Sequence, residues 1–308
     1  MSHYVIGDLH LAFSVNKPKD ILVVFGIFLK GLNKMKIINL VEDTKGNSAC
    51  EYEHGLSFYV ETKKHKILVD TGATDMFMRK AQVLNVDLEQ IDVVVLSHGH
   101  YDHAGGIMSF SKLNKKAGIY AQSTVGGEYY NLTDKKEKYI GIDKRILQLP
   151  QYKEVNGELK LDEELFLFSN ITGRKYPAKG NLNLKIKETQ GFIQDIFQHE
   201  QCLVITEGKK RILMSGCAHN GILNILERYE ELFDSEPDVV ISGFHMMKKE
   251  EYTAADVENI KDIANILKEK DTIFYTGHCT GEKAFWIMKE IMGEKLRWIH
   301  SGDSLENM

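Results

Sequence analysis

Short apolar runs separated by polar turns mark the first half of the chain. The segments 36–42, 56–62 and 65–70 (KIINLVE, LSFYVET and HKILVD) have the length and composition of strands joined in hairpins. After Thr71 a helical pattern continues to about Leu84, and the run 92–96 (DVVVL) is continuously apolar after its first residue. Such a run predicts a strand that is buried on both faces.

The pattern is less regular from about 110 to 190 and then returns to order. Strands are expected at 202–207, 211–216, 238–243, 272–277 and 296–302, and helices at about 220–232, 253–268 and 281–292. Thr253 followed by Asp256 favours a capped helix start. Strands that first pair and later alternate with helices, in two similar halves, predict an α/β layered sandwich of mixed sheets with helices outside. We interpret residues 110–190 as the variable part that shapes a substrate pocket.

The amino-acid composition and net charge of the chain argue against several classes of function. The 308 residues are 43% hydrophobic, enough for a sizeable core, and the formal net charge of −5 leaves no basic stripe for nucleic acid or anionic lipid. The longest uncharged apolar run, 21–29, is too short for a membrane span. The cysteines lack CxxC pairing, which favours a reducing cytoplasm over a disulfide framework; they are Cys50, Cys202, Cys217 and Cys279. We therefore expect a cytoplasmic protein with a small-molecule substrate and no nucleic-acid or membrane partner, while the oligomeric state stays open.

The segment LSHGHYDHAGG at 96–106 carries the strongest candidate chemistry. Three histidines and one aspartate lie directly after the buried strand: His98, His100, Asp102 and His103. Neutral imidazole and carboxylate are the ligands that a borderline divalent ion prefers. In an extended loop His98 and His100 point to the same side and share one ion, whereas Asp102 and His103 begin the next turn and face a second. The glycines in and after the motif let the backbone pass close to the ions.

The HxHxDH pattern resembles the motif of metallo-β-lactamase-fold hydrolases, and the resemblance runs from about Met35 to the C-terminus. It implies an αββα four-layer sandwich, with two mixed β-sheets and helices outside. It also implies that Asp70, in ILVDTGAT, orients a ligand histidine. Later strand ends supply further candidates: Cys217 and His219 in LMSGCAHNG, His245 in ISGFHM, and His278 with Cys279 in YTGHCTG. Many relatives carry a metal-bridging aspartate where Cys217 stands, so a thiolate ligand and an inert buried thiol both remain open.

Four segments together resemble one branch of that superfamily, the dihydropterin and ribofuranosylaminobenzene 5'-phosphate synthase-like proteins. They are EHGLS at 53–57, GCAHNGILNI, GFHM and GHCTG. In that branch the histidine of the GC-x-H segment, here His219, takes the role of an isolated third histidine. His199 and Glu200 are the only local alternatives between 184 and 203.

The resemblance implies two divalent ions, zinc first, with iron or manganese as alternatives. We assign one group of ligands to the first ion, namely His98, His100 and His219, and another to the second, namely Asp102, His103 and His278. A metal-bound hydroxide would attack an ester, lactone, thioester or phosphoester. Asp102 would also accept a proton as the leaving group departs. The alternatives are a pterin-linked phosphoribosyl-type synthase of the same fold, a di-iron redox protein, and a non-catalytic metal-dependent sensor.

Some residues can be interpreted either as part of the functional site or as ordinary packed or solvated residues. Glu53 and His54 either reach the pocket or belong to a solvated loop, and His245 either lines the pocket or packs in its loop. A third set either meets an anionic substrate or forms a solvated face; it comprises Tyr129, Tyr130, Lys135, Lys136 and Lys138.

The N-terminal stretch YVIGDLHLAF at 4–13 resembles the opening strand of calcineurin-like metallophosphoesterases, with Asp8 and His10 as the D-x-H pair. The later motifs that such a site needs are missing, because the only late GD dipeptide lies at 302–303, close to the end of the chain. We therefore expect residues 1–34 to be an extension, a phosphoesterase-like vestige or an over-long start, ahead of a single domain at 35–308.

Overall fold

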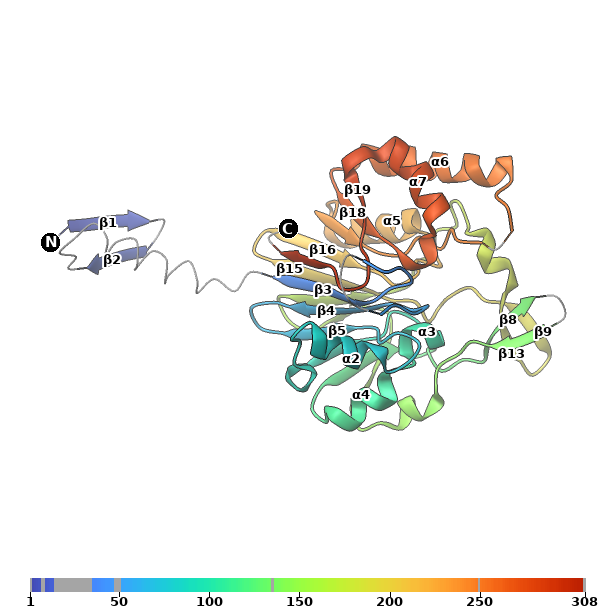
Figure 1. Cartoon of the computed structure of the whole chain (residues 1–308), viewed down its shortest axis with the longest axis horizontal. Helices are drawn as coiled ribbons and strands as arrows, with labels where there is room; N and C mark the ends of the chain where they lie inside the picture. The colour runs from blue at the N-terminus through green and yellow to red at the C-terminus, as the bar shows by residue number, and fades with distance from the viewer. Residues whose placement is uncertain are drawn as a thin grey trace.

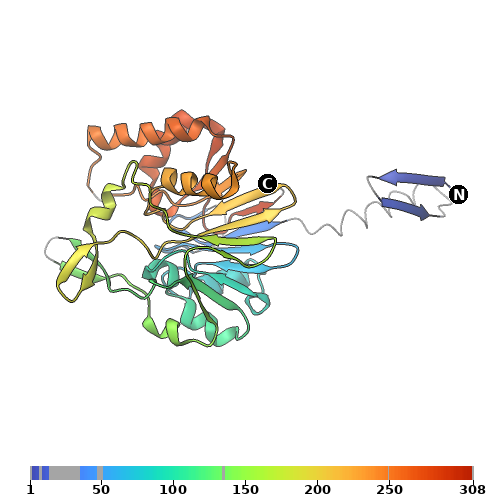
Figure 2. The ribbon, with the colours of Figure 1, turned by 180° about the vertical axis from the view of Figure 1, so that it is seen from behind.

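The computed structural model describes residues 2–6, 9–13, 35–46, 51–133, 136–248 and 250–306. Two seven-stranded mixed sheets pack face to face, and helices cover the outer face of each (Figure 1). The view from behind shows the same four layers (Figure 2). The expected αββα sandwich is thereby confirmed.

The first sheet comes from the N-terminal half and the last strand. Its order is β10-β7-β6-β5-β4-β3-β20, parallel from β10 to β5 and antiparallel from β5 to β20. The short strand β20 (Ser304–Glu306) returns the chain end to β3 (Lys36–Val41). The other strands are β4 (Ser57–Glu61), β5 (Lys66–Val69), β6 (Val93–Val95), β7 (Gly118–Gln122) and β10 (Tyr152–Val155).

The second sheet repeats this plan with the C-terminal half. Its order is β11-β12-β15-β16-β17-β18-β19, antiparallel from β11 to β16 and parallel from β16 to β19. Its strands are β11 (Leu159–Lys160), β12 (Leu165–Phe168), β15 (Cys202–Glu207), β16 (Lys210–Met214), β17 (Val239–Ile241), β18 (Ile273–Thr276) and β19 (Leu296–Trp298).

Three apolar clusters hold the layers together. One lies between the sheets, and one lies between each sheet and its helices. The first sheet carries α2 (Met76–Val83) and α4 (Ile107–Leu113). The second carries α5 (Ile222–Phe233), α6 (Ala254–Glu269) and α7 (Glu282–Met292). The predicted cap of α6 is confirmed, because the Thr253 hydroxyl and the Asp256 carboxylate each accept a backbone N–H of the other residue.

Residues 129–194, mostly within the region 110–190, contain a small sheet that the sequence pattern did not predict. Its order is β14-β13-β8-β9, and it is built from β8 (Tyr129–Thr133), β9 (Lys136–Tyr139), β13 (Leu184–Glu188) and β14 (Gly191–Gln194). Most of its residues are partly or fully exposed, so its strands lack the apolar alternation of half-buried strands.

Two strands lie within residues 1–34, the segment that we expect to be an extension. β1 (Ser2–Ile6) and β2 (Leu9–Phe13) form an antiparallel pair with each other. Asp8 lies outside the described residues, so the interpretation of the D-x-H pair stays a prediction.

His65, which directly precedes β5, joins two acidic side chains and makes stability depend on pH. Its Nδ1 lies 2.5 Å from Asp92 Oδ2, and its Nε2 lies 2.9 Å from Asp162 Oδ2. Burial by itself lowers the pKa of His65, but the two carboxylates outweigh it and raise the pKa above 6.5. A group with a raised pKa in the folded state contributes stability below its unfolded pKa and loses it as the pH rises through the folded value.

We therefore expect His65→Ala to lower the free energy of unfolding by about 1 kcal/mol near pH 5.5, and by clearly less near pH 9. Urea unfolding of the variant and the wild type at both pH values measures the difference. A deficit that does not change with pH would contradict the charged pairing of His65.

Candidate metal centre

The candidate ligands follow the carboxyl ends of parallel strands in both sheets. His98 and His100 come after β6, and the short helix α3 (Tyr101–Ala104) carries Asp102 and His103. Cys217 and His219 come after β16, and His278 opens the short helix η4 (His278–Thr280) after β18. Because these strand ends open at one edge of the sandwich, residues from both halves meet there.

The first proposed ligand group is assembled as expected from the sequence. The donor atoms of His98, His100 and His219 all lie within 4.8 Å of one another. His98 Nε2 is 3.0 Å from His100 Nδ1, and all three side chains are buried. His219 Nε2 is buried and has no hydrogen-bond partner within the described residues.

The second proposed group is also brought together. Asp102 Oδ2 lies 3.9 Å from His103 Nε2 and 3.6 Å from His278 Nε2. His278 Nε2 is a second buried nitrogen without a hydrogen-bond partner in the part of the chain that the structure describes. An unsatisfied buried polar atom is costly, and a metal ion at these nitrogens removes that cost. The donor set therefore fits divalent ions of the zinc type.

Asp70 lies where a residue that orients a ligand is expected. Its Oδ2 is 2.6 Å from His103 Nδ1, and it accepts the Ser97 hydroxyl at 2.6 Å. The same hydroxyl is 2.9 Å from His98 Nδ1. One buried carboxylate thus fixes the rings of two candidate ligands, a support commonly found behind metal-bound histidines.

Asp43 orients the ring of His278 as Asp70 orients the ring of His103, and we did not predict Asp43 from the sequence. Its Oδ1 lies 2.5 Å from His278 Nδ1 and its Oδ2 lies 2.8 Å from His54 Nδ1. His54 Nε2 in turn lies 3.3 Å from Asp102 Oδ2, so half-exposed His54 reaches the centre. The position of Asp43 directly after the predicted strand 36–42 was the one available signal, because candidate ligands also follow the ends of other predicted strands.

Two buried glutamates hold the backbone of the distant ligand loops. Glu200 accepts the N–H groups of His219 at 2.6 Å and Asn220 at 3.0 Å. Glu42 accepts the N–H of His278 at 2.6 Å. Burial raises the pKa of both carboxyls, although the hydrogen bonds counteract it. We call Glu42 and Glu200 the clamp glutamates.

Backbone strain is concentrated in these loops. Several residues other than glycine have a positive φ there, namely Asp70 (58°), Ala218 (52°), His245 (48°) and His278 (48°). Such conformations are uncommon for these residue types and persist only where the surrounding contacts enforce them. The clamp glutamates and Asp70 supply such contacts.

His199 was the local alternative to His219 as a ligand, and its ring is already engaged. Its Nδ1 accepts the Gly99 N–H at 2.9 Å, and its Nε2 lies 3.1 Å from Asp195 Oδ2. Its Nδ1 thus supports the HxHxDH loop, and its Nε2 is held by Asp195. Glu200 binds backbone N–H groups instead of facing the candidate ions.

The electrostatics suit metal binding by neutral imidazole. Burial, followed by the charges of neighbouring histidines, lowers the pKa of His98 and His219. Burial also lowers the pKa of His100 to about 3. These rings are therefore neutral at pH 7 and present lone pairs.

Near Asp43 and Asp102, the pKa values of two histidines are raised instead of lowered. Burial by itself would lower the pKa of His278, but the Asp43 carboxylate raises it to about 9. The Asp102 and then the Asp43 carboxylate, which accept hydrogen bonds from the His54 ring, raise the pKa of His54 to about 11. Burial raises the pKa of Asp102, but the His103 charge and the His54 hydrogen bond outweigh this and hold it well below its usual range.

The remaining sequence candidates lie around the centre. Glu53 accepts the Thr74 hydroxyl at 2.7 Å and is engaged there. Tyr129 is buried against His199, with ring centroids 4.1 Å apart, so it forms a wall of the centre. Tyr130 contacts Tyr139 and Phe192, and Lys136 and Lys138 lie on the exposed strand β9. Lys135 lies outside the described residues.

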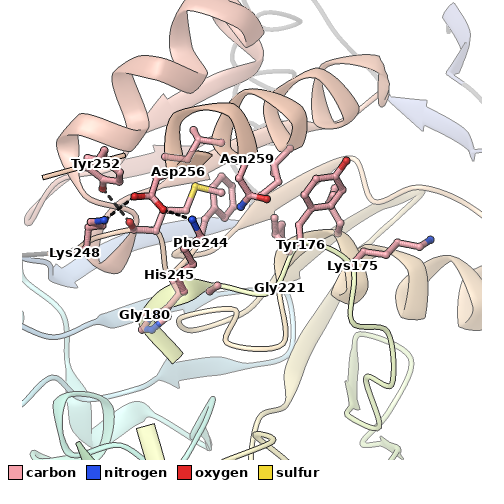
Figure 3. Close-up of a pocket in the computed structure, with 17 residues that line it drawn as sticks. Lys175, Tyr176, Gly180, Gly221, Phe244, His245, Lys248, Tyr252, Asp256 and Asn259 are labelled. Atoms are coloured by element: carbon pink, nitrogen blue, oxygen red, sulfur yellow. Dashed lines mark hydrogen bonds and ion pairs between the residues drawn. The ribbon is translucent and has the colours of Figure 1, made fainter. Parts of the chain in front are cut away.

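Two cavities adjoin the centre. One, of about 220 Å³, is lined by His219, Phe197 and Arg174, and the Phe197 ring stacks on His219 with centroids 4.5 Å apart. Figure 3 shows the other, in which His245 lies near Gly180 and the Lys248–Asp256 ion pair borders α6. His245 also packs against His219, with the rings tilted and their centroids 4.1 Å apart. It therefore lies between the centre and this cavity.

Two further observations concern the length of the helices and the state of the cysteines. Within the described ranges, no helix has the length and apolar character needed to cross a membrane. Cys202, Cys217 and Cys279 are free thiols, whereas Cys50 lies outside the described residues.

Comparison with known proteins agrees with this geometry. The family model of the metallo-beta-lactamase superfamily matches residues 52–185. The 7,8-dihydropterin-6-methyl-4-(beta-D-ribofuranosyl)-aminobenzene-5'-phosphate synthase of Methanocaldococcus jannaschii is 28% identical over 290 residues, which cover 88% of this chain and 96% of that protein. Ribonuclease Z of Nanoarchaeum equitans is 24% identical, covering 83% of this chain and 81% of its own length.

Solved structures show the same relationship. Tm1679, described as a metal-dependent hydrolase of the beta-lactamase superfamily, is 30% identical with a TM-score of 0.74, covering 88% of this chain and 98% of its own. YhfI from Bacillus subtilis, a metallo-beta-lactamase fold protein, has a TM-score of 0.55 at 15% identity, covers 89% of this chain and all of its own, and shows the shared fold alone. The chain belongs to the metallo-beta-lactamase superfamily.

Proposed function

We propose that this protein is a dinuclear metal-dependent hydrolase that acts on a small-molecule ester, lactone, thioester or phosphoester. The observation that carries the proposal is the meeting of two donor groups, one with His219 and one with His278, at one edge of the sandwich. Each group contains a buried imidazole nitrogen that lacks a hydrogen-bond partner among the described residues. Zinc is the ion that this histidine-rich donor set suits first, with iron or manganese as alternatives.

The residues of this chain would divide the work as follows. The first ion would be held by His98, His100 and His219, and the second by Asp102, His103 and His278. Bound ions of this kind polarise a substrate oxygen and activate a water molecule. Asp70 and Asp43 keep the ligand rings in orientation.

Asp102 has two candidate roles, as a ligand and as the group that accepts a proton. The lowered pKa of its carboxyl makes it a weak base, and its oxygen lies near His103 and His278, so we favour ligation. Half-exposed His54 lies 3.3 Å from the same carboxylate and can hold a proton at Nε2 beside the leaving group. The free thiols agree with a cytoplasmic site of action, which we retain as part of the proposal.

A synthase reaction is the second candidate, and it is favoured by the 28% identity with the Methanocaldococcus jannaschii synthase over most of both chains. That likeness suggests a pterin-linked substrate with a ribose phosphate. The superfamily fold by itself does not separate the two reactions, because one scaffold serves many chemistries.

Turnover tests the proposal directly. The metal-free protein would be reloaded with zinc, manganese or iron, and offered chromogenic phosphodiesters, lactones and thioesters. A second arm would offer the dihydropterin and aminobenzene riboside phosphate pair, and a third a short RNA, because ribonuclease Z is among the relatives. We expect hydrolysis of at least one small substrate, with the metal required. Product formation in the second or third arm alone would overturn the proposal in favour of the synthase or a nuclease, and no turnover in any arm would reject it.

A further inference from the structure

Asn181 holds the proposed ligand His219 through both ends of its side-chain amide. Asn181 lies in the short helix η3 (Lys179–Asn183). Its Nδ2 donates to the His219 backbone carbonyl oxygen at 2.7 Å, and its Oδ1 lies 3.0 Å from His219 Nδ1. The two residues are 38 positions apart in the chain, so the tertiary structure creates this contact.

The hydrogen bond to the backbone determines which nitrogen of the His219 ring carries the proton. A carbonyl oxygen only accepts hydrogen bonds, so the amide nitrogen of Asn181 must face it and the amide oxygen must face the ring. The amide oxygen also only accepts, so Nδ1 of His219 is the donor, and Nε2 of the neutral ring has the lone pair. This Nε2 is buried, belongs to the first proposed ligand group and has no hydrogen-bond partner within the described residues. Asn181 therefore leaves free the nitrogen that can bind an ion.

The short helix η3 is itself anchored on two sides. The Asn181 backbone carbonyl oxygen accepts Nε2 of Gln194, in β14, at 2.9 Å. Lys179 Nζ lies 2.6 Å from Oδ1 of Asp256, in the first turn of α6. Between these anchors, Gly180 lies so close to His245 that an added Cβ would be 3.2 Å from its Nε2 (Figure 3). The amide of Asn181 is therefore presented to His219 from a fixed position.

The support of His219 differs in charge from the supports in the second ligand group. There, the Nδ1 atoms of His103 and His278 face the carboxylates of Asp70 and Asp43. A carboxylate behind a ligand ring fixes its orientation and also raises its basicity. His219 Nδ1 faces a neutral amide instead. The support of His219 therefore acts through geometry and not through an added charge.

We propose that Asn181 is a positioning residue of the first metal position, which keeps the ring proton of His219 on Nδ1 and directs the Nε2 lone pair to the ion. This role rests on the proposed function, because that function assigns His219 to the first ion. Asn181 also lines the 220 Å³ cavity beside the centre, together with its neighbour Leu182. One residue thus belongs both to the cavity wall and to the support of a ligand.

Asn181→Leu tests this role, because leucine keeps the branched shape of asparagine and lacks both hydrogen-bonding groups. The full-length protein with isotope-labelled histidine would be stripped of metal, and long-range proton–nitrogen NMR spectra at neutral pH would show which nitrogen of His219 is protonated. The His219 signals are identified by their absence in His219→Ala. We expect the Nδ1–H form in the wild type and a shift toward the Nε2–H form in Asn181→Leu. Zinc affinity at the first position should fall by about 10-fold or more, as a competing chromogenic chelator would measure.

Two variants of the same short helix serve as controls. Leu182→Ala changes an exposed side chain of the cavity wall, and Asn183→Ala removes an exposed amide. Both should keep the Nδ1–H form and the zinc affinity of the wild type. Thermal melting checks the fold, because a merely structural role of Asn181 would lower the melting temperature without moving the His219 proton. Asn181→Ala, which cannot clash, carries the test if Asn181→Leu does not fold.

Three results would overturn the proposal: an Nε2–H form of His219 in the wild type, an unchanged proton position or zinc affinity in Asn181→Leu, or an equal change in both control variants. An unchanged Asn181→Leu beside a His219→Ala that loses one ion would reject this role and leave the proposed metal centre standing. Full metal content in His219→Ala would instead reject the assignment of His219 to the first ion, and the role of Asn181 with it.

Discussion

Alanine at His98 or at His278 should each strip metal from the centre, and these are the largest effects that we expect. His98 Nε2 belongs to the first ligand group and His278 Nε2 to the second. Each group has only three protein donors, so the loss of one leaves an open, poorly held ion. We expect metal affinity to fall by more than about 100-fold at the affected position, because even residues that merely support ligands account for about 10- to 100-fold. Metal analysis after dialysis should show about one ion fewer per chain.

His199 provides the matched control for these two variants. It is a buried histidine that stacks near His98, with ring centroids 6.0 Å apart, and both of its nitrogens already have partners. His199→Gln removes a support of the loop and no candidate donor, so it should lose clearly less metal than His98→Ala or His278→Ala. Full metal content in His98→Ala and His278→Ala would show that the ligand assignment is wrong. Loss of metal in His199→Gln together with retention in His219→Ala would show that His199, and not His219, is the third histidine ligand of the first ion.

Removal of the Glu200 carboxylate should have the second largest effect, on both the free energy of unfolding and the zinc affinity. Glu200→Ala leaves two backbone N–H groups and the Asn220 side-chain amide without their acceptor in a buried place. An unsatisfied buried donor costs about 1–3 kcal/mol, so we expect the free energy of unfolding to fall by about 3 kcal/mol or more. Zinc affinity should fall as well, because the strained turn at Ala218 and His219 loses its support. Urea unfolding and zinc titration measure both effects.

Glu42→Ala serves as a parallel test of the Glu200 prediction, and Glu258→Ala serves as its control. Glu42→Ala should reproduce the loss at the second ion, because it frees the N–H of His278 in the same way. Glu258 is an exposed residue of α6, and Glu258→Ala should change stability by no more than about 0.5 kcal/mol. Wild-type stability and wild-type zinc affinity in both clamp variants would show that the loops hold themselves.

Local patterns predicted those parts of the molecule that local chemistry controls. The apolar run 93–95 became β6, and the Thr253–Asp256 pair became the cap of α6. The HxHxDH segment presented four ligand candidates because a loop and one turn of helix fix their spacing. The small sheet of β8, β9, β13 and β14 escaped prediction, because exposed strands carry little hydrophobic periodicity.

The partners of the ligands depend on longer distances. Asp43 and His278 are 235 positions apart, and Glu42 and His278 are 236 apart. Nothing in the sequence around Asp43 separates it from any acidic residue after a strand. Only the order of the strands, which sets the chain end beside β3, brings its carboxylate to the second ligand group.

The sequence by itself therefore determined the class of fold and the superfamily, and it supplied the candidate histidine and aspartate donors. Hydrophobic periodicity and ligand type are properties of neighbouring residues and can be recognised along the chain. The tertiary structure alone decided that His199 supports a loop and that Glu42 and Glu200 hold the backbone of the loops with the candidate ligands. Those contacts join residues from different strands, and their physical cause is the packing of two sheets whose strand ends converge at one edge.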